Sequence, residues 1–537
     1  MTQISPIVGP RGEALPGSRA RAMASSVTAY DAADPVSQEL AMWYPVSGSA
    51  DRDILGEQRL IVDRIRDIER NNGWVSGAMT REVDQVIGYN FRPEPCPDAA
   101  ALGIDEEEAA DLADVFEREW TLFANDPQLY CDATRHDNCH GLFGLMFRHR
   151  RRDGAALALN LWRPRGGRYA TCVQVLDPDR LSNPNGRPDD DRLRGGVQLD
   201  ADGAAVGYWI RKGHPRDVGM SSLSGFEWEY VPRETPWGRP MVIHDFERKR
   251  AGQNVGLSDL APVLKNTRML DRYQAAELQT SVLNALLAAF IESPFDHEFL
   301  MEMLGDSGGE KAFDQYQGKR SAFHDKRGIS VGGVRIPALF PGEKIGFFNP
   351  TRPSAQMDSF VGTMLRNLAA AVPTHTAETV SLDYSRVNYS SARAATLVAS
   401  RSMLRERLSF GVRTGSQVYH AVIEEAVVSG RIELPAGAPD FHEAREAYLA
   451  CDWMGPAQGW VDPVKEAQAA GIRMDESVST LQAECAAQGL DWRDVIKQRA
   501  REIAFARKHG LPDPDREKSM AVVAPTDREE PAREQVQ

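Results

Sequence analysis

The chain has 537 residues, of which 42% are hydrophobic and 26% charged, so a folded protein with several structural regions is expected. Its formal net charge of -14 argues against a protein that wraps nucleic acid over its whole surface, because wrapping requires a large excess of basic side chains. Its six cysteines are too sparse for a disulfide framework, which favours a reducing compartment.

The N-terminal part is predicted to be a loose arm followed by amphipathic helices. Residues 1–50 are rich in Gly, Pro, Ser and Arg and lack the apolar run of a secretion signal. From Ile54 to Ile87 apolar residues recur mostly at spacings of three and four around Asn71-Asn72-Gly73, which predicts two helices joined at a turn. A further helix is expected over residues 105–123, because Asp105 and the glutamates after it suit the positive end of a helix dipole.

Residues 155–244 are predicted to be rich in β-strands. Short runs such as ALALNLW, YATCVQVL and AVGYWI alternate with turn sequences such as NPNG and DADG. Asp202-Gly203 in the second of these turns favours a hairpin between GGVQL and AAVGYWI. Residues 51–253 are therefore expected to form one region of helices followed by sheet.

The central part is predicted to be two helices that flank a mixed insertion. The first, at 254–293, contains a glycine-free stretch in which a helix of about 31 residues would be roughly 45 Å long. Its most apolar run, LQTSVLNALLAAFI, is too short and too polar to span a membrane. The insertion at 294–353 suggests short strands, and the second helix is expected at 354–372.

The last third is predicted to be mostly helical. A loop at 373–387 precedes a helical segment at 388–434 that begins NYSSARAATLVASRSMLRERLSF. Residues 435–511 are expected to be helical again, with a last helix that starts at an Asp491 cap and stops at Gly510. Residues 512–537, rich in Pro, Asp and Glu, are expected to be disordered.

The helix that begins this segment carries two semi-apolar faces. At about 100° per residue, Leu397, Leu404 and Leu408 form one narrow stripe with arginines at its margins, and small residues form a second face. Two such faces indicate burial between neighbours, and arginine is suited to planar ion pairs across an interface. The candidates for such a subunit interface are Arg393, Arg401 and Arg405.

Lys265, Arg268 and Arg272 stand at i, i+3 and i+7 of the long central helix and therefore share one face. Three interpretations remain open. The stripe is an ordinary solvated surface, it meets carboxylates of a neighbouring subunit, or it faces a polyanion such as DNA, whose phosphates are contacted without sequence specificity.

Two short patterns offer an enzymatic alternative. GDSGG around Ser307 matches the nucleophile signature of trypsin-like serine proteases, but the preceding FDHEFLMEML predicts helix where that fold needs a β-barrel. Four possible metal ligands lie within ten residues at an irregular spacing: Cys131, His136, Cys139 and His140. The preferred interpretation is a chain that catalyses no reaction and binds no metal or cofactor. The alternative is a serine hydrolase or a metal-dependent enzyme.

Several long segments, in fixed order, carry a resemblance. They are VLDPDRLSNPNG (175–186), LRGGVQLDADGAAVGYWI (193–210), VPRETPWGRP (231–240), IHDFERKRAGQNVGLSDLAPVL (243–264), SLDYSRVNYSSARA (381–394) and GPAQGWVDPVKEAQAA (455–470). Through them the chain, from about Tyr30 to Gly510, resembles the lambda-type portal proteins of tailed bacteriophages. The Cys131 to His140 segment has no evident place in this family pattern.

The resemblance implies an α+β portal fold that assembles into a ring, usually a dodecamer, at the portal vertex of the virion capsid. Residues 51–253 and 388–434 would form the wing, the two central helices the stem, 294–353 the clip, 373–387 the tunnel loop and 435–511 the crown. Under this assignment His375 and Arg386 of the tunnel loop join Lys265, Arg268 and Arg272 as DNA-channel candidates.

The resemblance also implies a set of partners and a sequence of events. Double-stranded DNA would pass through the ring during packaging and ejection. The clip would dock the terminase large subunit and later the head-tail connector, and the ring would nucleate procapsid assembly with the major capsid and scaffold proteins in the host cytoplasm. Neither a cofactor nor a membrane is implied.

Overall fold

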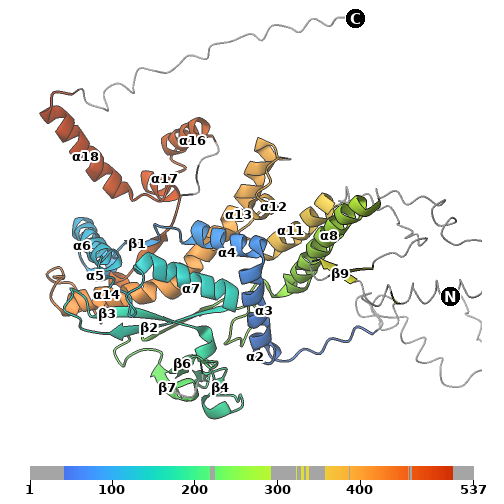
Figure 1. Ribbon diagram of the computed structural model, residues 1–537. Coiled ribbons are helices and arrows are strands. Elements are labelled where there is room, and N and C mark those ends of the chain that lie inside the picture. Colours follow the sequence, from blue (N-terminus) through green and yellow to red (C-terminus); the bar gives the residue numbers. More distant parts are fainter. Residues whose placement is uncertain are drawn as a thin grey trace, which may run out of the picture.

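The computed structural model describes residues 42–217, 224–291, 322, 328–331, 334–337, 357–385, 387–457, 459 and 462–511. The expected arm before residue 42, the expected tail at 512–537 and most of the insertion at 294–353 lie outside the described residues. The described part combines helices with antiparallel sheets, which confirms the expected α+β class (Figure 1). Within it, no helix has the length and apolar character needed to cross a membrane.

The N-terminal helices form where the apolar spacing predicts them. They are α2 (Ala50–Leu55), α3 (Gln58–Asn71) and α4 (Gly73–Val86). Asn72 ends α3 and caps α4, because its side-chain oxygen accepts a hydrogen bond from the Val75 N–H at 3.0 Å. The predicted pair of helices with a turn between them is confirmed.

Three further helices precede the sheets: α5 (Ala99–Leu102), α6 (Glu106–Ala124) and α7 (Cys139–Asp153). Asp105 and Glu108 form a capping box at the start of α6, as the acidic run before it suggests. Helix α7 ends at Gly154, which has a φ of +91° and packs so closely that a Cβ would lie 2.7 Å from the Cα of Leu257.

Two antiparallel sheets follow. The three-stranded sheet, in the order β3-β2-β8, consists of β2 (Ala155–Trp162), β3 (Thr171–Leu176) and β8 (Val242–Phe246). The four-stranded sheet consists of β4 (Leu193–Arg194), β5 (Val197–Leu199), β6 (Ala205–Arg211) and β7 (Trp228–Pro232). The expected hairpin joins β5 and β6, and its Gly203 has a φ of +84°.

Strand β2 is buried on both faces, which is why its sequence is almost wholly apolar. Ala156 and Ala158 belong to the main core beneath α7, whereas Leu157 belongs to a second core between the two sheets (Figure 1). The main core also contains a cluster of aromatic rings in which Phe91 stacks on Trp453 with ring centroids 4.8 Å apart. A third core lies between α3, α4, α8 and α11.

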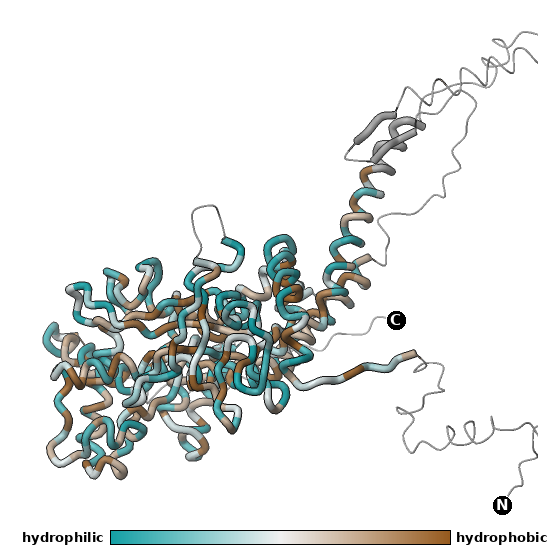
Figure 2. The backbone as a smooth tube through the Cα atoms, turned by 90° about the horizontal axis from the view of Figure 1, so that it is seen from below, coloured by the Kyte–Doolittle hydropathy of each residue, from teal (hydrophilic) through white to brown (hydrophobic). Residues whose placement is uncertain are grey.

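The two central helices lie side by side as α8 (Leu264–Ile291) and α11 (Met357–Ala371), and Tyr273 packs on Phe360 with ring centroids 4.8 Å apart (Figure 1). A short 3-10 turn, Ala261–Val263, precedes α8 and contains Pro262. The outer part of α8 projects away from the body (Figure 2). Within the insertion, β9 (Gly328–Val331) pairs antiparallel with β10 (Val334–Pro337), in agreement with the expected short strands.

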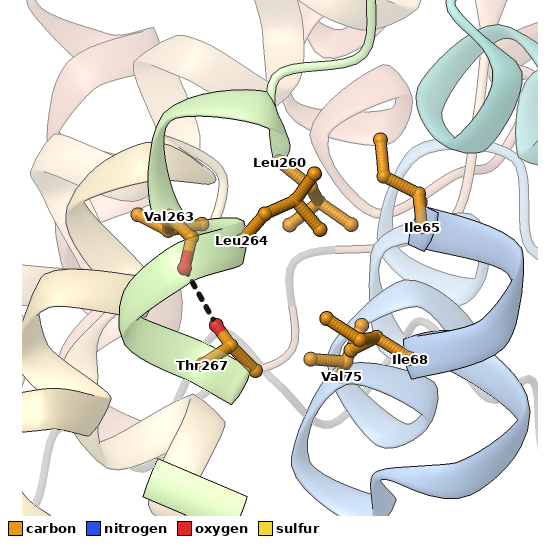
Figure 3. A pocket seen from close by; sticks show the side chains of 7 residues that line it. All are labelled: Ile65, Ile68, Val75, Leu260, Val263, Leu264 and Thr267. Atoms are coloured by element: carbon orange, nitrogen blue, oxygen red, sulfur yellow. Dashed lines mark hydrogen bonds between the residues drawn. The ribbon is translucent and has the colours of Figure 1, made fainter. Parts of the chain in front are cut away.

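The base of α8 is fixed to the body by apolar side chains. Figure 3 shows Leu260, Val263, Leu264 and Thr267 facing three side chains of α3 and α4 around a cavity of about 10 Å³, the other lining residues being Ile65, Ile68 and Val75. The Thr267 hydroxyl donates a hydrogen bond to the Val263 carbonyl at 3.0 Å, so the methyl group of Thr267 faces this cavity. A cavity of this size leaves room for no more than about one water molecule.

The segment after α11 contains α12 (Ala377–Ser381), α13 (Tyr389–Phe410), a π-helical turn at Gly411–Gly415 and α14 (Ser416–Val428). The π-helical turn lies where the Trp453 indole packs against two glycines. A Cβ at Gly411 would lie 2.4 Å from this indole and a Cβ at Gly415 2.5 Å from it, so only glycine fits at either position.

The C-terminal region contains α15 (Arg445–Tyr448), β11 (Cys451–Met454), α16 (Pro463–Asp475), α17 (Leu481–Ala487) and α18 (Trp492–Lys508). The expectation of a wholly helical region after residue 434 is wrong at β11, which pairs antiparallel with β1 (Arg92–Pro95). The physical reason is the apolar pair at the end of β11, because Trp453 and Met454 are buried in the body. Asp491 caps α18 as expected.

Candidate DNA-channel and subunit-interface surfaces

The basic stripe of Lys265, Arg268 and Arg272 lies on the exposed face of α8. The opposite face of the helix is buried through Val263, Thr267 and other residues that pack on the body. Within the part of the chain that the structure describes, no ion pair involves any of the three cations. Their charge is therefore not neutralised by any carboxylate among the described residues.

His375 does not join this stripe. Its side chain is buried, the residue being only 6% exposed, and its Nε2 lies 2.8 Å from the Ala78 carbonyl of α4. Burial lowers the pKa of this imidazole, although the nearby Glu82 carboxylate acts in the opposite direction. The neutral imidazole of His375 is held inside the protein, where it supports the loop at residues 373–387. Arg386, the fifth DNA-channel candidate, lies outside the described residues.

Helix α13 leaves an apolar stripe in solvent. Leu397 is 53% exposed, Leu404 48% and Leu408 60%, whereas Met403 and Phe410 on the other side are buried in the main core. Only one of the two expected apolar faces is therefore covered by the chain itself. An exposed stripe of leucines indicates a surface for a partner.

The three interface arginines of α13 differ in their surroundings. Arg393 forms an ion pair with Glu466 of α16, and Arg405 pairs with Glu406 at 2.7 Å and with Glu247 at 3.6 Å. Arg401 is exposed within the apolar stripe and pairs with none of the described carboxylates. Of the three, Arg401 is the one whose charge is left for another molecule.

Sequence reasoning missed a network of buried charges at the end of α7. The guanidinium of Arg150 donates to Asp245 of β8 at 3.2 Å and to Glu406 of α13 at 3.1 Å, and its side chain is only 2% exposed. Next to it, Arg151 pairs with Glu82 of α4 and with Asp259 before α8. The sequence signal that could have indicated this network is RHRRRD, a run of charges directly between the apolar stretches of α7 and β2.

The network continues on the outer side of α7. Asp153 accepts hydrogen bonds from His149 at 2.6 Å, from Arg152 at 2.8 Å and from Arg66 at 2.8 Å. Burial opposes ionisation of Asp153, but these donors outweigh it and hold the pKa of the carboxyl far below its ordinary value. The arrangement ties α3, α7 and the body together through charge-assisted hydrogen bonds.

The Cys131 to His140 segment forms a turn that leads into α7. The Asp132 carboxylate accepts backbone hydrogen bonds from Thr134 and His136, each at 2.8 Å, and these outweigh burial and lower its pKa. Burial raises the pKa of the Cys131 thiol to about 12 and that of Cys139 well above its ordinary value, so both favour the neutral thiol. No three of the four possible metal ligands in this segment come together in the structure.

One group of possible metal ligands does meet among the residues that can be described, namely Asp177, Asp179 and His214. The Arg66 guanidinium already occupies it, since it donates to Asp177 and to Asp179, each at 2.9 Å. An arginine in this position supplies the positive charge that a metal ion would otherwise bring.

The hydrolase interpretation gains no support from the described residues. A serine nucleophile needs a histidine as its base, and His244 and His297 are two histidines available in the sequence. Ser307 and His297 lie outside the described residues, and His244 is part of the three-stranded sheet. The His244 ring packs between Tyr208 and Phe246, and burial lowers its pKa to about 4. It lines a cleft of about 610 Å³ between the two sheets, whose other walls include Arg233 and Arg248.

Comparison with known proteins identifies the family. A family model described as "Phage portal protein, lambda family" matches residues 37–407. Portal protein B of Escherichia phage lambda is 30% identical over 489 residues, which cover 89% of each chain. The portal protein of Escherichia phage N15 is 31% identical over 489 residues, 89% of this chain and 90% of that one.

A more distant relative and a solved structure are also similar to this chain. The "probable portal protein" of Halomonas phage phiHAP-1 is 22% identical over 482 residues, 87% of this chain and 84% of that one. A chain in the virion of a native gene transfer agent particle is 14% identical with a TM-score of 0.34, covering 76% of this chain and 96% of that one. The family match spans more than half of the sequence, and the chain belongs to the lambda family of phage portal proteins.

Proposed function

We propose that copies of this chain assemble into a ring of about twelve subunits at one vertex of a phage capsid, and that double-stranded DNA passes through the centre of the ring. The observation that carries this proposal is family membership over 89% of the chain. The long helix α8, which packs beside α11, projects from the body and carries a basic stripe with no ion pair among the described residues, supports its DNA-facing part. The exposed apolar stripe of α13 supports its subunit contact.

In this proposal, the part of the chain before α8 together with α13 and α14 forms the wing, α8 and α11 form the stem, and residues 294–353 form the clip. The loop between α11 and α13 is the tunnel loop, and α16 to α18 belong to the crown. The β11 strand and the aromatic residues around it are part of the body core, so the crown begins after Met454.

The acidic chain suits a conduit through which DNA moves. A net charge of -14 repels phosphates over most of the surface, and a few basic side chains repeated around a ring keep the duplex centred. Contacts of this kind depend on phosphates and not on base sequence, so each can break and re-form as the duplex advances. Lys265, Arg268 and Arg272 are the described residues that fit this role.

Assembly is tested by the mass of the purified full-length protein in solution and by end-on electron-microscope averages. A central hole and a mass of about twelve times 59.4 kDa are expected, whereas a stable monomer at every salt concentration would contradict assembly without scaffold. Leu404→Glu with Leu408→Glu should abolish the ring because two carboxylates would be buried in the subunit contact. The matched control is Leu60→Glu on α3, where the side chain is 54% exposed.

The conduit is tested by reversing the charge of Lys265, Arg268 and Arg272 to Glu in the assembled ring. DNA packaging or retention should fall while the ring still forms. Reversal of three exposed arginines on α3, namely Arg59, Arg64 and Arg70, controls for net charge and should leave packaging at the wild-type level. Normal packaging by the α8 variant would remove the basic stripe from the channel.

The docking role is proposed for the clip. The terminase large subunit would bind there during packaging, and the head-tail connector would bind once the head is full. Deleting most of residues 294–353 should spare the fold of the body, because the described core residues of the body lie outside this segment. The same deletion should abolish terminase binding in a pull-down, and unchanged binding would place the docking surface elsewhere.

The site of action that follows is the portal vertex of the virion, reached by assembly in the host cytoplasm with the major capsid and scaffold proteins. This part of the proposal rests on the family. It predicts that antibody against the chain labels one vertex of each particle.

A further inference from the structure

The Arg151 guanidinium joins three separate parts of the chain. It lies on the last turn of α7, and its side chain is 4% exposed. Its Nε lies 2.9 Å from Glu82 of α4, and its Nη1 lies 2.6 Å from Asp259, in the segment that leads into α8. The same Nη1 is 3.8 Å from Glu406 of α13.

The Glu82 carboxylate is shared with the loop between α11 and α13. The Oε1 atom that pairs with Arg151 also accepts a hydrogen bond from the Thr374 hydroxyl at 3.0 Å. The residue before Glu82 on α4 is Arg81, whose guanidinium donates to the Val380 carbonyl at 3.3 Å. Helix α4 is thus the platform on which the loop rests, and Glu82 connects that platform to Arg151.

Asp259 belongs to the base of α8. It lies between Ser258, whose hydroxyl donates to the Arg151 carbonyl at 2.6 Å, and Leu260, which is buried in the core beneath α8. Both the side chain and the backbone carbonyl of Arg151 are therefore bonded to this short segment. A displacement of the base of α8 cannot occur without moving Arg151 or breaking these bonds.

A guanidinium suits this connection because it is planar and rigid and donates to two carboxylates in fixed directions at once. Glu82 is fully buried, so releasing its oxygen from Arg151 would leave a charge without compensation in a region from which water is excluded. The pair is therefore expected to move as one unit instead of separating.

We propose that Arg151 is a positioning residue that couples the base of α8 to the loop at residues 374–385. Motion of α8 displaces Asp259 and, through their ion pairs, Arg151 and Glu82. The displacement of Glu82 changes the hydrogen bond that holds Thr374. This inference rests on the proposed function for its meaning, because α8 is there the stem and the loop lines the channel. The coupling itself concerns contacts within one chain.

The test is hydrogen exchange of the full-length protein, read by mass spectrometry over Ala377–Ser381 and the residues beside it. Asp259→Ala should raise the exchange rate there by about tenfold or more, although the ion-pair partners of Asp259 are Arg151 and Lys249 and neither belongs to the loop. The matched control is Lys249→Met, which removes the other cation paired with Asp259 and leaves Arg151 in place. Its loop should exchange at the wild-type rate.

A second variant keeps the positive charge at position 151 but removes the planar geometry of the guanidinium. Arg151→Lys retains a cation, but a single ammonium cannot hold Glu82 and Asp259 in the same fixed directions, so the loop should again exchange faster. The double variant of Asp259→Ala with Arg151→Lys should exchange no faster than the faster single variant, because both changes act on one path. Wild-type exchange in the loop of both single variants, or additive effects in the double variant, would overturn the coupling.

The mass of each sample, measured in parallel, separates this inference from the proposed function. A wild-type protein that fails to form a ring contradicts the assembly proposal and leaves the exchange comparison valid. A wild-type ring whose Asp259→Ala variant keeps a protected loop supports assembly and overturns the coupling.

Discussion

The end of α7 and the outer face of α8 both carry closely spaced cations, yet the structure treats them in opposite ways. At the end of α7, Arg150 and Arg151 are buried and bonded to carboxylates from α4, α13 and β8. On α8, the basic stripe is exposed and unpaired among the described residues. The difference teaches that a paired arginine fixes the positions of helices, whereas a cation without a described partner keeps its charge exposed, as the proposed contact with DNA requires.

The largest effect in this comparison is expected at Arg150. Arg150→Met leaves Asp245 and Glu406 buried without their cation, which should lower the free energy of unfolding by about 3–5 kcal/mol. Denaturant unfolding of the full-length protein measures it. The control is Lys497→Met, which removes an exposed ion pair with Asp114 and should change the free energy of unfolding by less than about 1 kcal/mol. Equal losses in the two variants would contradict the distinction between buried and exposed cations.

A smaller effect on stability is expected from replacing a glycine with alanine, and it should differ between the closely packed body and α11. Gly411→Ala would force a Cβ to within 2.4 Å of the Trp453 indole and should destabilise the protein by about 1–3 kcal/mol. Gly362→Ala on α11 meets nothing within 4 Å and should be neutral or stabilise the helix by up to about 1 kcal/mol. Thermal unfolding of both variants gives the comparison, and destabilisation by Gly362→Ala would show that α11 is covered in the assembled protein.

The pH dependence of stability should reflect Asp153. Because its pKa is lowered on folding, the stabilisation is fully present above the unfolded value of about 3.9 and is lost as the pH falls through and below it. Asp153→Asn should be less stable at neutral pH and should show a shallower loss of stability on acidification. Asp475→Asn, an exposed carboxylate on α16, should keep the wild-type slope. An unchanged slope in Asp153→Asn would contradict the assigned role.

The smallest effect on stability is expected on α8. Replacing Lys265, Arg268 and Arg272 with Glu should change the free energy of unfolding by no more than about 0.5 kcal/mol at each position, because the exposed side chains form no ion pair with the residues that the structure describes. Unfolding of the triple variant beside Arg150→Met provides the contrast. A large loss in the triple variant would show that the stripe is paired within the assembly and is not free for DNA.

The elements that sequence reasoning predicted best are those with a strong local cause. The turn at Asn72, the acidic start of α6, the hairpin at Gly203 and the Asp491 cap all depend on residues within a few positions of one another. The strand β11 could not be predicted in this way, because its partner β1 lies more than three hundred residues earlier. Its formation depends on long-range burial of Trp453.

The candidate site residues divide along the same line. The shared face of Lys265, Arg268 and Arg272 follows from helical periodicity alone, and so does the leucine stripe of α13. The burial of His375 depends on α4, a helix almost three hundred residues away in the chain. Local sequence contains no information on such a contact.

By itself, the sequence of this protein determined the α+β class, the boundaries of several helices, the portal family and the basic face of α8, because each depends on local pattern or on long ordered matches. Only the tertiary structure decided which cations are paired. RHRRRD has the composition of a solvated charge run, and it is buried because carboxylates from α4, α13 and β8 converge on it. Such convergence is a property of the folded chain, in which the energy of burying each charge depends on partners brought from distant parts of the sequence.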